Sequence, residues 1–192
     1  MSFSSEDSKF LVRGFEYVAK SANLQATLEN LVKVASECVG SNGGSLYLLD
    51  AKRGVLTPCV LYNLPEEYLA GCAEVPLGTQ CCGRAALHKV PWTVCDMLTD
   101  PLFADCREAA RASGIRAAFS VPVLDANGDC LGSLACHFRE PYEPTTYALE
   151  RNRLFAQLIA FAIARRQAMT GIGVQRAIAP DLTKAVSSTE AI

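Results

Sequence analysis

The sequence predicts an α+β fold built on a mostly antiparallel sheet. Two pairs of apolar stretches are each joined by a short loop of turn-forming residues, Asp50–Gly54 and Asp125–Gly128, which is typical of β-hairpins. Amphipathic helical patterns precede the first hairpin and follow the second. The segment between the hairpins, Leu64–Ile115, contains only short elements. We therefore expect the terminal helices on one face of the sheet and this segment on the other.

Two helical patterns precede the first hairpin. Apolar residues recur at helical spacing in Ser8–Lys20 and again in Asn23–Val39, after which Gly40 is a natural stop. The stretch Ser45–Leu49 has apolar residues on both faces of an expected strand. Its partner strand is expected at Val55–Tyr62, directly after the hairpin loop.

The segment between the hairpins alternates loops with short elements. Pro65 occupies the favoured first position of a short helix. The loop Gly78–Gly83 leads into a helix at Arg84–His88, and Trp92–Cys95 is a short strand. A further loop and helix fill Asp96–Gly114. A sheet face covered in this way is a common place for a pocket that binds a small ligand.

The second hairpin and a long helix complete the expected fold. Its strands are expected at Ala117–Leu124 and Asp129–Phe138, and the helix at Tyr147–Ala168, whereas Gly171–Ile192 is weakly patterned. A chain of 192 residues, half of them hydrophobic, can bury a core without disulfides or metals. We expect an N-terminal helix that serves dimerisation, a main domain and a tail, at residues 1–22, 23–168 and 169–192.

Composition and charge exclude several classes of function. The 18 basic and 20 acidic residues give a formal charge of −2, and no Lys/Arg block stands out, so we expect no nucleic-acid partner. No apolar run approaches the roughly 20 residues of a membrane span, so no membrane partner is expected. Because the N-terminus also lacks a secretory signal, we expect a cytoplasmic protein.

The nine cysteines show no CxxC pair and no zinc-binding spacing with histidine. Disulfides are rare in a reducing cytoplasm, so we expect most of these cysteines to be small core residues, and we predict no metal site. They stand at Cys38, Cys59, Cys72, Cys81, Cys82, Cys95, Cys106, Cys130 and Cys136.

Six short blocks occur in order along the chain. They are Gly44-Ser-Leu-Tyr-Leu-Leu-Asp50, Leu64-Pro-Glu-Glu-Tyr-Leu69, Cys82-Gly-Arg-Ala-Ala86, Asp100-Pro-Leu-Phe-Ala-Asp105, Gly114-Ile-Arg-Ala-Ala-Phe-Ser-Val-Pro-Val123 and Gly128-Asp-Cys-Leu-Gly-Ser-Leu-Ala135. Together the blocks resemble a GAF domain over roughly Leu24–Arg166, of the sensory type found before histidine kinases and diguanylate cyclases and in nitrate receptors. The resemblance implies the GAF fold and small-ligand sensing in signal transduction, without catalysis.

The terminal helices are expected to form a homodimer. The apolar stripe of the last helix, together with Phe10, Leu11 and Phe15, exceeds what one sheet face needs. A bundle of these helices from two copies has alternative packings that a ligand can bias. A histidine kinase or another signalling protein is the expected partner.

The chain departs from this sensory type around the expected pocket. The loop Leu77–Ala85 is shorter than the one common in the family, and Arg84 replaces a small Thr. Phe103 and Phe119 stand where the family often has Trp. These departures predict a reshaped pocket, so the identity of the ligand does not carry over from the resemblance.

The turn Cys81-Cys82-Gly83 is the first candidate ligand site, because it lies at an expected helix start. Backbone amides and the helix dipole there favour a small anion such as nitrate or a carboxylate, and they also lower the pKa of a thiol. Gly83 would let the backbone approach the ligand, so a side chain there should block binding and spare the fold. The alternative is a tight turn with a buried cysteine.

Phe103, Ile115 and Phe119 form the second candidate, because they sit where similar GAF domains line the pocket. Apolar walls with a few polar groups suit a small organic ligand. Cys136, on the last expected strand, completes the set of expected ligand-binding residues. The alternative for these residues is plain core packing.

Haem and bilin are cofactor alternatives, and the cofactor stays open. His137 lies on a strand that resembles a His-containing strand of phytochrome-like GAF domains, in which bilin attaches near Cys106. Here Arg107 follows Cys106, where those photoreceptors usually have histidine. His137 and His88 are also potential haem ligands, and a structural role for His137 is the alternative.

A second resemblance joins Cys82, Cys95 and Cys106 to free methionine-(R)-sulfoxide reductases, which are enzymes of GAF fold. Their reaction needs one thiolate to attack the sulfoxide sulfur and another thiol to resolve the sulfenic acid as a disulfide. The chain lacks the lid sequence of that family around Cys106. We therefore expect no catalytic residues, with the reductase activity as the alternative.

Overall fold

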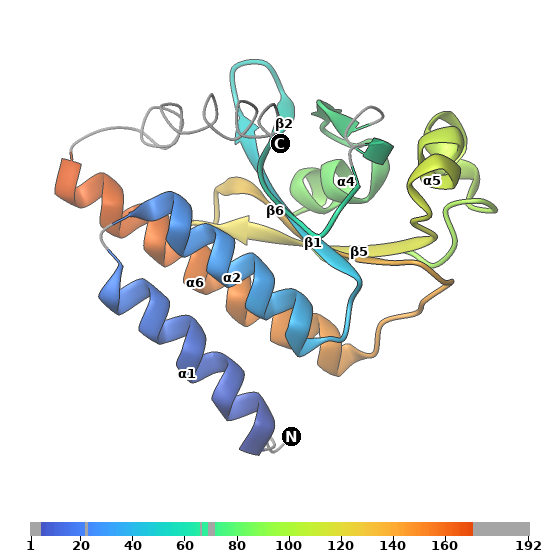
Figure 1. Cartoon of the computed structure of the whole chain (residues 1–192). Helices are drawn as coiled ribbons and strands as arrows, with labels where there is room; N and C mark the ends of the chain where they lie inside the picture. The colour runs from blue at the N-terminus through green and yellow to red at the C-terminus, as the bar shows by residue number, and fades with distance from the viewer. Residues whose placement is uncertain (1–4, 22, 66, 69–71, 171–192) are drawn as a thin grey trace, which may run out of the picture.

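Six strands form one antiparallel sheet in the order β3-β2-β1-β6-β5-β4 (Figure 1). The computed structural model describes residues 5–21, 23–65, 67–68 and 72–170. The central strands β1 and β6 come from opposite halves of the chain, and Ser45 of β1 pairs with Ala135 of β6. The strands are β1 (Gly43–Asp50), β2 (Val55–Tyr62), β3 (Val75–Pro76), β4 (Trp92–Val94), β5 (Ala117–Leu124) and β6 (Cys130–Phe138).

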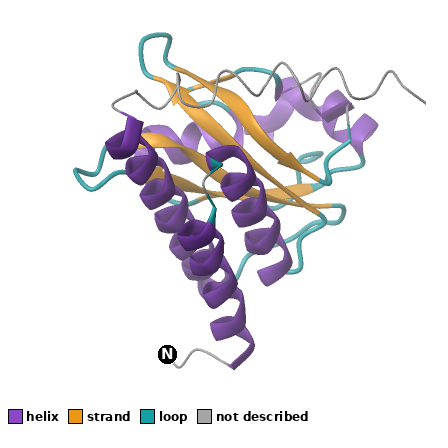
Figure 2. Ribbon diagram, turned by 60° about the vertical axis from the view of Figure 1, so that its left-hand side comes forward, coloured by secondary structure: helices purple, strands orange, loops and turns teal. Residues whose placement is uncertain are grey.

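Long helices cover one side of the sheet, which we call the helix face (Figure 2). Helices α2 (Leu24–Cys38) and α6 (Thr146–Thr170) pack on the strands, and α1 (Ser5–Lys20) packs against both of them. The side chain of Asn23 caps α2 by accepting a hydrogen bond from the Ala26 amide at 3.2 Å. The core of this face is mainly aliphatic and includes Leu28, Leu31, Val32, Leu46, Val121, Leu134, Phe155 and Ile159.

Helix α1 approaches α6 closely because Gly14 has no side chain. A Cβ atom there would lie 2.9 Å from Cδ1 of Leu158. The guanidinium of Arg165 donates a hydrogen bond to the carbonyl of Val18 one turn further along. Leu11 also packs against the helix-face core. Part of the apolar surface from which the sequence predicted a dimer is thus buried within a single copy.

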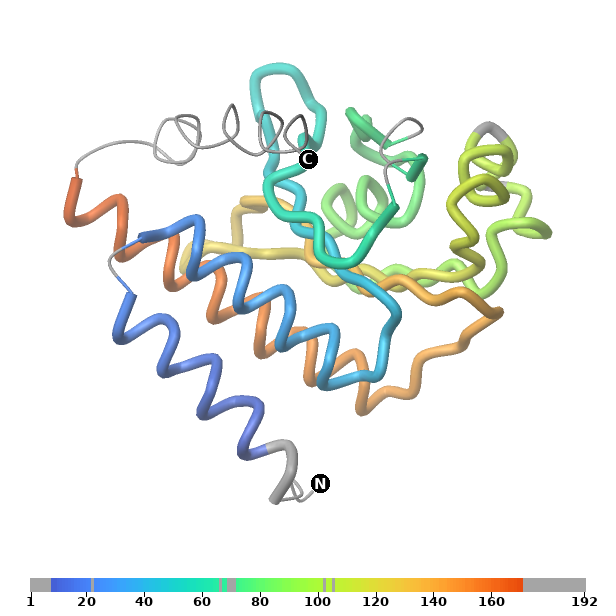
Figure 3. Tube along the Cα trace, viewed as in Figure 1, coloured from blue at the N-terminus to red at the C-terminus, as the bar shows by residue number. Residues whose placement is uncertain are grey.

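The opposite side of the sheet, which we call the capped face, lies beneath the described residues between β2 and β5, 63–65, 67–68 and 72–116 (green to yellow-green in Figure 3). The capping segment contains α4 (Gln80–His88), the 3-10 helix η1 (Pro101–Cys106) and α5 (Arg107–Ser113). Gly114 ends α5 at φ +68°, a left-handed conformation that suits glycine. The core between the sheet and the capping segment contains buried apolar residues of both, including Leu56, Val75, Val94, Met97, Phe103, Ile115 and Ala118.

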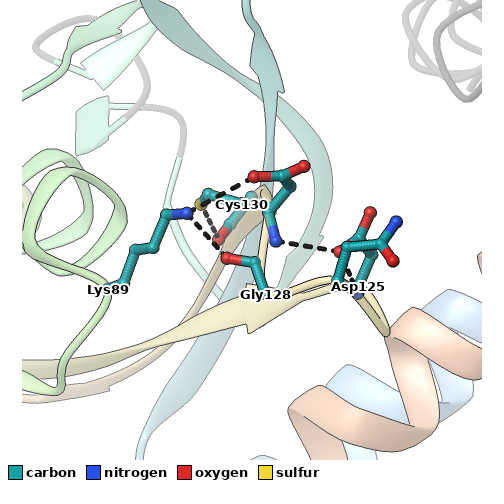
Figure 4. A network of polar contacts seen from close by, with 7 residues as sticks. Lys89, Asp125, Gly128 and Cys130 are labelled. Atoms are coloured by element: carbon teal, nitrogen blue, oxygen red, sulfur yellow. Dashed lines mark hydrogen bonds and ion pairs between the residues drawn. The ribbon is translucent and has the colours of Figure 1, made fainter.

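A polar network joins the end of α4 to the β5–β6 hairpin (Figure 4). Nζ of Lys89 donates to the carbonyl of Gly128 at 2.7 Å and lies 3.5 Å from a carboxylate oxygen of Asp129. The carboxylate of Asp125 accepts from the backbone amides of Asn127 and Asp129, both at 2.8 Å. The hairpin turn is therefore closed by its own aspartate, and its tip holds the C-terminal end of α4.

The structure confirms the predicted fold class and the order of the elements. Helix α4 starts at Gln80 rather than Arg84, because the residues expected to form a loop make its first turn. Helix α6 continues past Ala168 to Thr170. The short helix expected from Pro65 lies only partly, and the expected tail from residue 171 not at all, within the described residues.

The cysteines mostly occupy the core, as expected. All nine lie within the described part of the chain, none forms a disulfide, and six are buried. No described helix combines the length and the apolar character that a bilayer crossing requires.

Candidate functional site

Alternate residues of each strand point to opposite faces of the sheet. On β6, Leu134 belongs to the helix-face core, whereas the next residue, Ala135, packs with the capping segment. Cys136 returns to the helix face, and His137 points to the capped face. This alternation decides which predicted site residues can meet.

Buried polar side chains gather on the capped face. They come from three neighbouring strands of the sheet, from α4 and from the segment before β3. No member is more than 5% exposed. We call this set the capped polar cluster: Ser45, Tyr47, Tyr68, Cys72, Cys82, Ser120, Ser133 and His137.

His137 lies at the centre of this cluster and is fully buried. Its Nε2 is 2.9 Å from Oγ of Ser45, and its ring meets the ring of Tyr68 edge-on, with centroids 4.9 Å apart. Burial lowers the pKa of His137 to about 3, so the imidazole is neutral at physiological pH. Its Nδ1 is buried and has no hydrogen-bond partner among the described residues. The capped polar cluster thus holds one buried nitrogen that lacks a partner among the described residues.

The other members of the capped polar cluster are linked by neutral hydrogen bonds. The phenol of Tyr47 donates to the carbonyl of Cys72 at 2.8 Å, and the thiol of Cys72 donates to Oε1 of Gln80 at 3.4 Å. Oγ of Ser120 lies 2.5 Å from Oγ of Ser133. These bonds connect the strands to the start of α4, so the cluster spans the sheet and its cap.

Burial keeps three thiols near the start of α4 protonated. Burial raises the pKa of Cys82 to about 11 and that of Cys72 to about 12, and it raises the pKa of Cys81 well above the ordinary value. The expectation that the start of α4 lowers a thiol pKa is wrong here, because desolvation of the thiolate outweighs the helix dipole. These three cysteines are neutral thiols at physiological pH.

Gly83 faces β3 rather than open space. A Cβ atom there would lie 2.3 Å from the carbonyl oxygen of Pro76, and the Gly83 carbonyl accepts a hydrogen bond from the Gly78 amide at 2.9 Å. Glycine is therefore required for the packing of α4 against β3. The expectation that a side chain at this position spares the fold is wrong.

The structure separates the predicted site residues into two groups. Phe103, Ile115, Cys81 and Cys82 all lie in the core of the capped face. Phe119 does not lie on the same face as Phe103, although the resemblance placed both in the lining of the ligand pocket. Its place on the helix face follows from the strand alternation.

Cys136 also lies on the helix face. It pairs with Phe119 across β5 and β6, and both side chains belong to one buried group with Phe138. The thiol of Cys136 donates to Oδ1 of Asn152 in α6 at 3.4 Å. Neither Phe119 nor Cys136 therefore lines the capped face.

Sequence reasoning missed the serines and tyrosines of the capped polar cluster. Ser120, Ser133 and Ser45 stand in strands whose other residues are mostly apolar. Polar residues separated by an even number of positions, such as Ser133 and His137 on β6, lie on the same face of a strand. They are the signal that identifies a polar face on a buried strand. Tyr68 has no such signal, because it lies outside the strands.

The candidate cofactor ligands differ in their surroundings. His88 is exposed and stacks on Trp92, with ring centroids 5.4 Å apart. The ring of His137, in contrast, is fully buried and in edge-on contact with the ring of Tyr68. Cys106 is half-buried and packs against the capped-face core. Within the described ranges, no group of three or more His, Cys, Asp or Glu residues could hold a metal ion.

Comparison with known proteins agrees with this architecture. Residues 23–163 match the GAF domain family. The methyl sulfide methyltransferase-associated sensor of Methanosarcina acetivorans is 29% identical over 158 residues, which cover 81% of this chain but 16% of that protein. This chain thus spans only a small part of that relative.

Solved structures show the same fold. The GAF domain of a phosphoenolpyruvate-protein phosphotransferase from Coxiella burnetii has a TM-score of 0.75 at 19% identity, over 89% of this chain and 100% of that one. Free methionine-R-sulfoxide reductase from Neisseria meningitidis has a TM-score of 0.69 at 23% identity, over 88% and 96%. The match to the family and the shared architecture lead to one conclusion: this chain belongs to the GAF domain family.

Proposed function

We propose that this domain is a sensory module that binds a small ligand on the capped face of its sheet and signals through its helices. The observation that carries the proposal is the fully buried Nδ1 of His137, which has no partner among the described residues. Leaving a buried polar atom without a partner costs about 1–3 kcal/mol, so a ligand that hydrogen-bonds to it would remove this cost. The sensor named among the relatives supports a sensory role.

Binding without turnover is the favoured activity. Thiol chemistry on a sulfoxide needs a thiolate as the attacking group. Because burial raises the pKa of Cys82 and of Cys95, two of the three cysteines compared with the reductases, only a small fraction of either thiol is ionised at neutral pH. The likeness to reductases concerns the fold, which hosts several functions.

Strand β6 offers a short route from the ligand to α6. His137 contacts the ligand site on one face, and its neighbour Cys136 donates a hydrogen bond to Asn152 of α6 on the other. A ligand that shifts His137 would therefore also displace a contact of the long C-terminal helix. Because His137 and Cys136 are adjacent residues on opposite faces of β6, a ligand bound on the capped face can affect the contact with α6 on the helix face.

A second copy is the proposed partner of the outer helix surface. Val12 and Phe15 of α1 and Phe161 and Met169 of α6 are large hydrophobic residues that are more than half exposed. Met169 lines a groove together with Val18 of α1, whereas Phe161 lines a second groove together with Leu124 of β5. We propose that these surfaces pair in a homodimer and that a histidine kinase or a similar protein receives the signal.

A ligand screen on purified protein tests the binding site. The absorption spectrum comes first, because haem or bilin would be visible at once. Small anions and small organic molecules are then screened by thermal shift on the wild type, on His137→Gln and on His88→Gln as the matched surface control. A ligand should raise the melting temperature of the wild type and of the control by mass action, but not that of His137→Gln. An unchanged response in His137→Gln would place the site elsewhere.

Two further measurements test the remaining parts of the proposal. Light scattering at high micromolar concentration should show a dimer for the wild type, and Phe15→Glu should weaken it. A monomeric wild type would contradict the dimer. Reduction of free methionine sulfoxide that disappears in Cys82→Ser or Cys106→Ser would overturn the assignment of a non-enzymatic sensor.

A further inference from the structure

The capped polar cluster contains no charged group. Its members are three hydroxyls, two phenols, two thiols and the imidazole of His137. Burial raises the pKa values of Tyr47 and Tyr68 and of both thiols, and it lowers the pKa of His137. Each of these groups is therefore held in its neutral form.

Four cations of the capping segment make contacts outside the cluster. The guanidinium of Arg116 forms two hydrogen bonds with the carboxylate of Asp96, at 3.0 and 2.6 Å. Arg84 lies over the ring of Trp92, 5.5 Å from its centroid. Among the residues that the structure describes, neither arginine belongs to the cluster around His137.

Two further cations, Arg107 at the start of α5 and Lys89 at the end of α4, also have contacts outside the cluster. Arg107 donates to the backbone carbonyl of Asp100 at 3.2 Å. Lys89 is bound to the tip of the β5–β6 hairpin through Gly128. Each of these four cations thus makes a contact outside the capped polar cluster.

An anion at this site would be stabilised mainly by the start of α4. Cys82 lies in the first turn of that helix, whose N-cap residue Thr79 makes no side-chain capping bond. The dipole of one nine-residue helix is a weaker contribution than the desolvation of an ion in a buried site. The physical balance therefore favours a neutral ligand over an anion.

From these observations we propose that the ligand is an uncharged small organic molecule that hydrogen-bonds to Nδ1 of His137, not an anion such as nitrate. This inference rests on the proposed function of the same site. Neutral imidazole carries its proton on one nitrogen, so Nδ1 donates or accepts according to the role of Nε2 toward Ser45. Phe103, Met97 and Ile115 of the capped-face core suit an apolar part of the same molecule.

Acetamide and acetate form the test pair, because they have nearly the same shape and differ in charge at pH 7. The readout is the imidazole ¹H–¹⁵N NMR spectrum, in which Nδ1 and Nε2 of His137 give separate signals. Acetamide should shift the Nδ1 signal of the wild type and of the His88→Gln control. Acetate and nitrate should bind at least tenfold more weakly. As the pH is lowered and acetate becomes acetic acid, its apparent affinity should rise.

Two variants of His137 locate the contact. The amide of Gln can replace Nε2 toward Ser45 but offers nothing at Nδ1, whereas the amide of Asn lies near the position of Nδ1. We expect His137→Gln to lose the binding of acetamide and His137→Asn to keep part of it, as measured from the backbone amide signals of β6.

Each outcome decides between the two proposals. If acetate or nitrate shifts the His137 signals as strongly as acetamide, the proposal of an uncharged ligand is wrong, whereas the proposed ligand site at His137 is supported. If acetamide binds His137→Gln as tightly as the wild type, the site itself is wrong. If neither probe moves the His137 signals at high millimolar concentration, the site is closed to ligands and both proposals fail.

Discussion

The two faces of the sheet differ in chemistry although the same strands build both. On the helix face the buried strand residues are mostly aliphatic or aromatic, and polar contacts gather around Cys136 and Asn152. On the capped face apolar residues are mixed with the serines, phenols, thiols and imidazole of the capped polar cluster. Burying polar groups costs free energy unless each is hydrogen-bonded. The capped face therefore depends more on its internal hydrogen bonds, whereas the helix face depends mainly on apolar packing.

The largest expected effect is the loss of an aromatic residue on the helix face. Phe119 is fully buried and lies beside Phe138, with ring centroids 6.0 Å apart. We expect Phe119→Ala to lower the free energy of unfolding by about 3–5 kcal/mol, measured by urea denaturation. The imidazole NMR signals of His137 should stay in place, because the two side chains lie on opposite faces. A large shift of these signals in the folded variant would contradict the expectation that a change on the helix face leaves the capped face unaffected.

The next effect is a loss of stability in acid that depends on His137. Burial lowers its pKa from the ordinary 6.5 to about 3, so between these values the unfolded chain binds a proton that the folded chain excludes. The stability is complete above pH 6.5 and falls as the pH decreases, by up to about 1.4 kcal/mol per pH unit.

His137→Gln should remove this part of the pH dependence, because the amide does not take up a proton. Urea denaturation of both proteins at several pH values between about 6 and about 4 measures the two slopes. Equal slopes would mean that the imidazole is not held neutral on the capped face.

A smaller effect is expected where the cap meets the sheet edge. The Cβ atom introduced by Gly83→Ala would lie 2.3 Å from the Pro76 carbonyl oxygen, so α4 or β3 must shift. We expect a loss of about 1–3 kcal/mol in the free energy of unfolding. Leu87→Ala, at a half-exposed position of the same helix, is the control and should change stability by less than about 0.5 kcal/mol. A neutral Gly83→Ala would show that the cap is loosely attached.

The smallest effect concerns the serine pair of the capped face. Ser120 and Ser133 share a hydrogen bond of 2.5 Å, and Ser120 also contacts the carbonyl of Leu134 at 3.3 Å. We expect Ser120→Ala and Ser133→Ala each to cost about 1 kcal/mol. The double variant should cost less than the sum of the two, because each single change leaves one hydroxyl without its partner. Strict additivity in denaturation experiments would show that the two hydroxyls are independent.

The sequence predicted the strands well because their turns carry explicit signals. Asp125–Gly128 is a hairpin loop in the sequence, and the structure closes it with the Asp125 carboxylate. The expected strand Val55–Tyr62 also matches β2. Local turn chemistry and hydrophobic spacing are properties of neighbouring residues, so they can be recognised in the chain itself.

The sequence predicted the site less well because the faces of these strands are hard to tell apart. Phe119 and Ala118 are both buried, so no alternation of polar and apolar residues shows which one faces the cap. The pairing of Phe119 with Cys136, which places both on the helix face, depends on the register of two strands. Thiol pKa values depend on the packing around Cys82, which no local pattern contains.

The pairing of β1 with β6 has a consequence for how the chain folds. Ser45 and His137, which are hydrogen-bonded neighbours in the folded sheet, stand 92 residues apart in the sequence. Closing so long a loop carries an entropic cost before its contacts form, which slows folding. During synthesis the β1–β2 hairpin leaves the ribosome before β6 does. The edge of β1 that later pairs with β6 is unpaired until β6 emerges. Until then that edge can pair with another chain, so aggregation of the nascent chain should compete with folding most strongly in this interval.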